Sequence, residues 1–263
     1  MMAGDRQLYL NKCSDYQSSI DTMLAWEKNF AAEMPEDPVE LAVGKVKLVN
    51  ESLDLSSHYI MLNEISMSVL DKKNENAMNN ARKSIIKAIT FMEELVSPFL
   101  DAPYGEYEER VERLVQVSAK ERYFLIKKQG LAIDLLKNTY GENTKWKWSF
   151  VDIEGRFITV TKNFLDLKNA VYNTDLRSPD YEPTFYHIRL IKKLLSKGAD
   201  MYREKYEIVS HLETDFKKSI AFLNALRYIY SVLGESENAE LIKKKAEIWS
   251  GKLEADIKRE KQK

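Results

Sequence analysis

Residues 38–70 carry the pattern that most restricts the fold of this chain. Two columns of apolar side chains run through the stretch, and each column repeats every seven residues. The first column is Val39, Val46, Leu53, Ile60 and Met67, and the second is Leu41, Leu48, Leu55, Leu62 and Val69. Positions two residues apart lie about 200° apart on an α-helix. The segment therefore predicts a helix about 50 Å long that buries two opposite sides between two neighbours.

Prolines and glycines divide the rest of the chain into further helical segments, because proline lacks the backbone N–H donor and disfavours helix in the residue before it. The breaks are Pro35/Pro38, Pro98/Pro103, Pro179/Pro183, and turns at Gly141 and Gly234. About seven helices are expected, spanning roughly 5–33, 38–70, 75–97, 104–139, 146–172, 184–233 and 236–262. Thr184 is the expected cap of the sixth, which is either one helix or two broken near the SHLETD sequence at 210–215.

These segments predict an all-α protein with two or three helices longer than 30 residues, packed as an elongated or V-shaped bundle. The ITVT stretch at 158–161 is β-prone, but it lies inside a strong helical stripe, and the periodicity favours helix. Three regions are expected: an N-terminal bundle segment (1–100), a long central hairpin (101–183) and a C-terminal region (184–263). They form either separate domains or one continuous domain.

Composition excludes several classes of protein. The net charge of −1 gives no overall attraction to nucleic acid. Residues 1–100 carry 10 Lys/Arg and 15 Asp/Glu, whereas residues 184–263 carry 17 and 12, so opposite ends could attract each other. Cys13 is the only cysteine, which excludes an internal disulfide. No membrane span is expected. The chain is cytoplasmic if it is complete as given, and periplasmic if a signal peptide has been removed.

The TKWKWSF stretch at 144–150 alternates tryptophan and lysine, as a nucleic-acid or membrane patch would. Trp146 also begins a stripe with helical spacing, and this favours burial of Trp146 in a core. The stripe is Trp146, Phe150, Ile153, Phe157, Val160, Phe164, Leu167 and Val171. Trp148 lies beside this stripe and is expected to be packed or partly exposed, which makes it a further candidate for protein contacts. Lys145 and Lys147 are expected on the solvent side.

Sequence motifs for catalysis or cofactor binding are missing: the chain has no Gly-rich phosphate loop, HExxH, GxSxG or CxxC. Glu207, His211 and Asp215 follow at intervals of four and would share one helix face, as metal ligands do. A helical di-iron site needs paired Glu-x-x-His motifs, which are missing here. A solvated polar face is favoured, and no catalytic, cofactor or metal residue is expected.

Aromatic residues at the proline breaks are the best candidates for protein contacts. Tyr104 and Tyr107 follow the second break, and Tyr181, Phe185 and Tyr186 flank the third. Aromatic side chains at bundle ends either form partner-binding patches or cap the core where helices turn. Capping is favoured, and both roles are kept open.

Residues 219–253 resemble a single tetratricopeptide repeat. Five residues fall where that family places its leucine, tyrosine, turn glycine and two close-packing alanines: Leu226, Tyr230, Gly234, Ala239 and Ala246. Arg227 replaces the usual glycine, and a clean second copy is missing, although a solenoid needs at least three repeats. The resemblance implies a helical hairpin that binds a peptide or protein partner, with Asn224 and Tyr230 as contact residues.

The chain as a whole, all-helical, charged and rich in tyrosine, resembles the helical proteins that coat spirochaete flagellar filaments, such as the flagellar coiling protein family. That resemblance implies lateral assembly on a filament in the periplasm.

The leading expectation is a non-enzymatic structural or scaffolding protein that assembles with itself or with other proteins through long helical faces. A peptide-binding adaptor built on the C-terminal hairpin is the alternative, and a helical metalloenzyme is a distant third.

Overall fold

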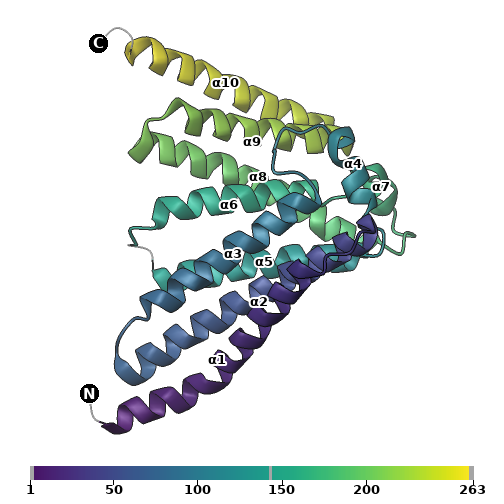
Figure 1. The fold of residues 1–263 in the computed structure, drawn as a ribbon. Helices are drawn as coiled ribbons and strands as arrows, with labels where there is room; N and C mark the ends of the chain where they lie inside the picture. The colour runs from purple at the N-terminus through teal and green to yellow at the C-terminus, as the bar shows by residue number, and fades with distance from the viewer. Residues whose placement is uncertain (1–2, 142–143, 261–263) are drawn as a thin grey trace. The chain divides into compact units, whose positions relative to one another are not determined.

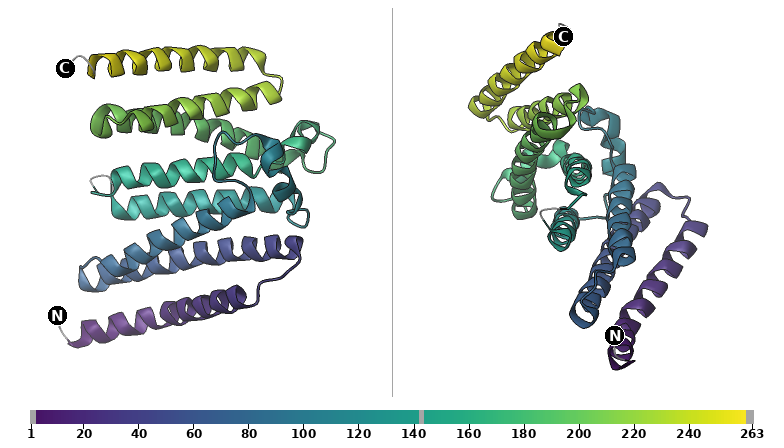
Figure 2. Two further views of the ribbon diagram at one scale, coloured as in Figure 1. Left: turned by 45° about the horizontal axis from the view of Figure 1, so that its top comes forward. Right: turned by 90° about the vertical axis from the view of Figure 1, so that its left-hand side faces the viewer.

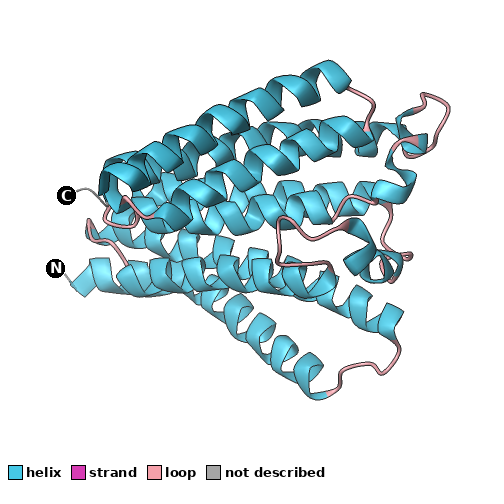
Figure 3. Cartoon of the chain, turned by 90° about the horizontal axis from the view of Figure 1, so that it is seen from above, coloured by secondary structure: helices cyan, strands magenta, loops and turns pink. Residues whose placement is uncertain are grey.

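The computed structural model describes residues 3–141 and 144–260, which form helices and connecting turns without any strand (Figures 1 and 3). Ten α-helices, one 3₁₀ turn (η1) and one π-helical turn (η2) follow one another along these residues. They are α1 Ala3–Ala32, α2 Pro38–Leu70, α3 Glu75–Leu95, α4 Tyr104–Glu112, α5 Ala119–Tyr140, α6 Lys147–Asn163, α7 Leu167–Ala170, η1 Tyr172–Thr174, α8 Tyr181–Lys205, η2 Tyr206–Ser210, α9 Glu213–Val232 and α10 Ser236–Glu260. The all-α prediction is confirmed, and the number of helices is corrected from about seven to ten.

Two compact units make up the chain. The first contains Met1–Val96 with Glu109–Thr144, and the second contains Ser97–Glu108 with Lys145–Lys263. Whether the regions 1–100, 101–183 and 184–263 fold as separate domains stays a prediction, because compactness alone does not test independent folding. Of the helices described, only α2, with 33 residues, is longer than 30, so the expectation of two or three is corrected.

In the first unit, α2 packs against α1 and α3, and α5 packs against α2 and α3 (Figure 1). Both predicted columns of α2 contribute to this core, because Leu53 and Ile60 of one and Leu48, Leu55 and Leu62 of the other are buried. The expected burial of α2 on two sides is therefore confirmed. Ile20 of α1 is also buried, with Cys13, Tyr16 and Met23 packed around the same cluster.

The predicted single helix over 104–139 is wrong, because the chain breaks between α4 and α5. Ser118 caps α5: the backbone N–H of Glu121 donates to the Ser118 hydroxyl, and the Glu121 carboxylate accepts from the Ser118 N–H at 2.8 Å. The Arg122 guanidinium donates to the Leu114 carbonyl at 2.7 Å and to the Val117 carbonyl at 2.9 Å. These side chains satisfy the backbone at the break. Leu114, within the break, and Leu125 of α5 are both buried.

In the second unit, α6, α8, α9 and α10 stack in chain order, each against the next (Figure 2). Gly155 lets α6 approach α8 closely. A Cβ atom at Gly155 would lie 2.7 Å from Cε2 of Tyr202. The Tyr202 ring has little room to move, since it is 4% exposed, stacks on Phe222 and donates a hydrogen bond to Asp152 at 3.2 Å.

Two expectations for this unit are corrected, and one open alternative is decided. The helix predicted over 146–172 ends at Asn163, and Val171, the last member of its stripe, is 54% exposed. The sixth helix begins at Tyr181, so Thr184 is a buried helical residue and not a cap. The 184–233 segment forms two helices, separated by η2 and by His211 with a φ of 48°. This break lies at the SHLETD sequence, one of the two alternatives. The ITVT stretch is helical, as predicted.

Replacing Gly155 by alanine should destabilise the protein by about 1–3 kcal/mol, because the added methyl group overpacks the α6–α8 contact. Gly251 in α10 is the matched control, since nothing lies within 4 Å of the place that an added methyl group would occupy there. Gly251→Ala should stabilise the protein by about 0.5–1 kcal/mol, because alanine favours helix over glycine. Urea unfolding followed by circular dichroism measures both, and equal stabilisation by the two variants would contradict the close packing.

Candidate functional site

Exposed aromatic and aliphatic side chains gather at the N-terminal end of α8 and in the η1 loop that packs on it. Phe185 and Tyr186 are each 42% exposed. The Phe185 ring stacks on Tyr181 and meets Tyr186 edge-on, with ring centroids 5.7 Å apart in both pairs. Together with three exposed residues of the loop, these three form what we call the aromatic surface. Its members are Val171, Tyr172, Leu176, Tyr181, Phe185 and Tyr186.

The η1 loop is held by its own hydrogen bonds. The Arg177 guanidinium binds both carboxylate oxygens of Asp175, at 2.9 and 2.6 Å. The Ser178 hydroxyl donates to the Asn173 side chain at 3.0 Å, and the Ser178 carbonyl accepts from the N–H of Tyr181 at 3.1 Å. Loop residues Tyr172 and Leu176 are nevertheless 71% and 79% exposed. The loop therefore presents apolar side chains from a backbone that is already ordered.

Tyr104 and Tyr107 cap the core, as the sequence favoured. Tyr107 is 1% exposed, so its ring has no surface to offer a partner. The half-buried Tyr104 packs edge-on against it, with centroids 5.4 Å apart, and donates a hydrogen bond to Asp166 at 3.2 Å. Burial, followed by the negative charge of Asp166, raises the pKa of the Tyr104 hydroxyl.

A buried polar cluster that the sequence did not suggest lies at the C-terminal end of α6. Lys162 is 2% exposed, and its Nζ donates to the Leu100 carbonyl at 2.7 Å. The Asn163 side chain donates to the carbonyls of Ser97 and Phe99 at 2.9 and 3.0 Å. These bonds fasten the non-helical segment before α4 to the end of α6. Lys162 and Asn163 lie in sequence between members of an apolar stripe, where polar residues normally face solvent. No sequence signal therefore indicated their burial.

The Lys162 amine has a structural role in this geometry. Burial lowers the pKa of Lys162 to about 8, an effect that the nearby Asp101 carboxylate partly opposes. Lysines with lowered pKa values serve as nucleophiles in some enzymes. Here, however, the amine is bonded to a carbonyl, has almost no access to solvent and faces the Tyr107 ring at 5.9 Å. The Lys162 side chain therefore anchors the backbone at Leu100, and its amine is not positioned to contact a substrate.

The tryptophans of the KWKW stretch belong to the start of α6. Trp146 precedes the first helical residue and is half-buried, so its expected burial is found only in part. Trp148 is also half-buried and packs against the core of the second unit. Packing was one of the two placements expected for it. Lys147 is exposed, with its Nζ 4.8 Å from the Trp148 ring centroid. The lysines thus lie on the solvent side, as predicted.

The hairpin of α9 and α10 forms as the tetratricopeptide resemblance implies, with Gly234 at a φ of 74° and both Ala239 and Ala246 buried. Asn224 is exposed on α9, whereas the half-buried Tyr230 ring lies 5.0 Å from the Lys192 amine. Burial, followed by the charge of Glu235, raises the pKa of Tyr230. Asn224 and Tyr230 lie roughly 120° apart around the helix, so the two do not share one face.

The three residues weighed as metal ligands do not share a helix face, because the helix is broken at His211. The Glu207 carboxylate accepts hydrogen bonds from Lys252 and from Arg203, which together lower the pKa of Glu207. Asp215 is 4% exposed and pairs with Lys205 at 3.4 Å. Within residues 3–141 and 144–260, no group of three His, Cys, Asp or Glu side chains is placed to hold a metal ion.

The described helices also include none that is long and apolar enough to cross a membrane.

These features define a class: an all-α protein with stacked helices, an ordered aromatic surface and a buried polar tether. The chain belongs to the TP0443 family, whose model matches residues 5–257. The family takes its name from Treponema, a spirochaete, which agrees with the spirochaete resemblance of the sequence. No curated protein and no solved structure matches the chain.

The lowered pKa of Lys162 predicts how stability depends on pH. Between about pH 8, its value in the folded protein, and about pH 10.4, the unfolded chain binds a proton that the folded chain does not. The folded state therefore gains stability as the pH rises. Relative to Lys162→Met, the wild type should gain about 2 kcal/mol in unfolding free energy from about pH 7 to about pH 9.5.

Urea titrations of both proteins at several pH values measure this difference. Lys244, exposed on α10, provides the control variant Lys244→Met, whose difference from the wild type should not follow the same trend. A pH-independent difference for Lys162→Met would contradict the burial of a charged amine.

Proposed function

We propose that this protein is a non-enzymatic scaffold that binds other proteins through the aromatic surface. The observation that carries the proposal is the set of exposed apolar side chains on an ordered loop and on the first turns of α8. Tyrosine and other aromatic side chains are enriched among the residues that dominate binding energy in protein interfaces. An ordered loop loses little conformational freedom on binding, so more of its contact energy remains as affinity.

We further propose that the assembly is a spirochaete flagellar filament, with this protein in its sheath. Two observations support this assignment: the resemblance of the chain to helical proteins that coat such filaments, and the membership of a family named after Treponema. A sheath protein needs lateral contact surfaces and no catalytic centre. A periplasmic location follows from the proposal.

Co-sedimentation with purified spirochaete flagellar filaments tests the proposal. The wild-type protein should pellet with filaments, and the double variant Tyr172→Ala/Phe185→Ala should bind at least about tenfold more weakly, because both side chains would be buried in the contact. Both positions are exposed, so the fold should be unaffected. Leu241→Ser, at a 64% exposed position of α10, is the matched control.

Filament binding that the double variant retains would remove the aromatic surface as the contact. A failure of the wild type to bind filaments would remove the flagellar assignment, and cross-linking in spirochaete cells would then identify the protein that the aromatic surface contacts.

A second candidate function is a peptide-binding adaptor, which the observed α9–α10 hairpin favours. In that case Asn224→Ala should weaken capture of the peptide partner and leave self-association unchanged. Calorimetric titration with a peptide from a cross-linked partner measures the effect, and unchanged affinity would count against the hairpin as the binding site.

A further inference from the structure

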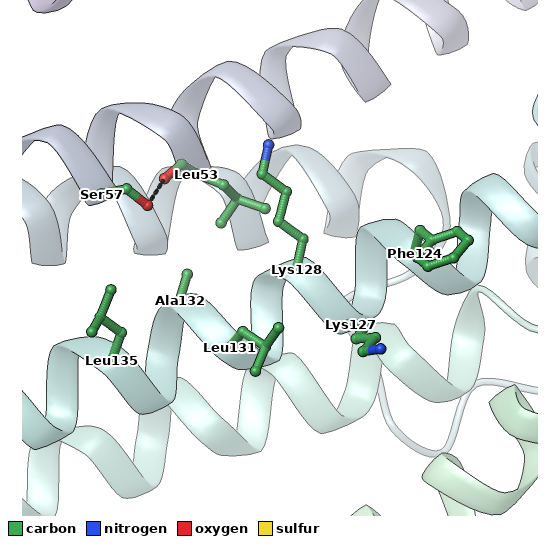
Figure 4. Close-up of a pocket in the computed structure, with 8 residues that line it drawn as sticks. All are labelled: Leu53, Ser57, Phe124, Lys127, Lys128, Leu131, Ala132 and Leu135. Atoms are coloured by element: carbon green, nitrogen blue, oxygen red, sulfur yellow. Dashed lines mark hydrogen bonds between the residues drawn. The ribbon is translucent and has the colours of Figure 1, made fainter.

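One face of α5 in the first unit carries large apolar side chains that no other helix covers. Phe124, Leu131 and Leu135 are 51%, 60% and 45% exposed. They border a groove of about 310 Å³ whose floor includes Leu53 and Ser57 of α2 together with Ala132 of α5 (Figure 4). The buried side of the same helix contains Leu125 and Leu136.

Charged residues flank the exposed face on one side, and their sign changes along the helix. Lys120, Lys127 and Asp134 follow at intervals of seven, beside the column of Phe124 and Leu131. The positive charges lie toward the N-terminal end of α5 and the negative charge lies toward its C-terminal end. Lys128, which also borders the groove, is already paired with Asp54 of α2 at 2.8 Å.

The occupant of this face must satisfy its own backbone hydrogen bonds. The groove lies between two helices, whose interior backbone groups are bonded within each helix, so it offers no row of free N–H and carbonyl groups to an extended strand. The apolar side chains also protrude, unlike those of an enclosed small-molecule pocket. A helix with apolar side chains at intervals of three, four and seven residues fits this surface.

We propose that a second copy of this chain covers the face, with the two α5 helices antiparallel across a twofold axis near Lys127. Pairing Lys120 with the partner's Asp134 sets this register, and the same register places Phe124 against the partner's Leu131. Because the contact is symmetric, each of these pairs forms twice. In an antiparallel helix pair, residues on one flank of a helix face residues on the equivalent flank of its partner. The column of Lys120, Lys127 and Asp134 therefore faces its own copy running in the opposite direction. As a result, the positive end of each column lies opposite the negative end of the other.

Self-complementarity favours a second copy over a foreign acidic helix. A uniformly acidic partner would pair with Lys120 and Lys127 but would place a like charge beside Asp134. The second copy instead supplies a carboxylate opposite Lys120 and a lysine opposite Asp134. The two Lys127 side chains meet near the axis, where they cost affinity. A single helix pair of this length makes a small interface, so a dissociation constant on the order of 10 µM is expected.

This inference goes beyond the proposed function, because it concerns the first unit and holds whether or not the aromatic surface binds a filament.

Sedimentation-velocity ultracentrifugation of the full chain over a concentration series tests the dimer. Lys120→Asp alone and Asp134→Lys alone should each weaken dimerisation at least about tenfold, because each places like charges opposite one another. The double variant Lys120→Asp/Asp134→Lys should restore dimerisation to within about threefold of the wild type. Recovery of the dimer in the double variant would show that the single variants lose a charge pair and not the fold.

Two further variants examine the apolar contact. Leu131→Ser should weaken the dimer, and Lys127→Leu should tighten it by removing the like charges at the axis. Leu241→Ser, at an exposed position of α10, should leave the dimer unchanged. A chain that stays monomeric at all concentrations, or a dimer that the double charge exchange fails to restore, would overturn the proposal. So would binding of a foreign helix at this face by a monomeric chain.

Discussion

A helix that buries two opposite sides needs a neighbour on each, and α2 imposes this requirement on the first unit. Leu55 and Leu62 of its second column pack in one cluster with Ile20 of α1 and Ala77 of α3, while Leu53 of its first column lies beside α5 at the groove. Small polar residues such as Ser52 and Ser56 are buried between the columns and let neighbours come close. The large apolar side chains of the unit that remain exposed include Met61 and Met67 of α2 and those on the exposed face of α5.

The second unit depends on a different feature, a buried lysine whose amine donates a hydrogen bond to a backbone carbonyl. Lys162 and Asn163 donate hydrogen bonds to three carbonyls of the non-helical segment Ser97–Leu100. These bonds give partners to backbone groups that have none within a helix. Burying an amine costs stability, and the lowered pKa of Lys162 is the sign of that cost. The same bonds join the end of α6 to the segment that precedes α4.

Both proposed contact surfaces sit on parts of the molecule that are already ordered. The aromatic surface lies on a loop closed by Asp175, Arg177 and Ser178, and the exposed face of α5 lies on a helix with a complete cap at Ser118. Preorganised side chains suit a scaffold, whose affinity must come from surface contacts alone. The two surfaces belong to different units, so a protein with both could self-associate through one and bind a second assembly through the other.

Periodicity in the sequence by itself determined the helical class and the two-sided burial of α2, because repeats of apolar residues report directly on helix faces. The α9–α10 hairpin was expected from the resemblance to a tetratricopeptide repeat. Periodicity could not place the breaks after α4 and at Asn163, and it left open whether the chain breaks near His211. There the apolar rhythm continues, while side chains outside the break, such as Arg122, satisfy the backbone. Nor could it separate the buried Tyr107 from the exposed Phe185, since aromatic side chains suit a core and a contact surface equally well. Only the packing of neighbouring helices decided which side chains remained exposed.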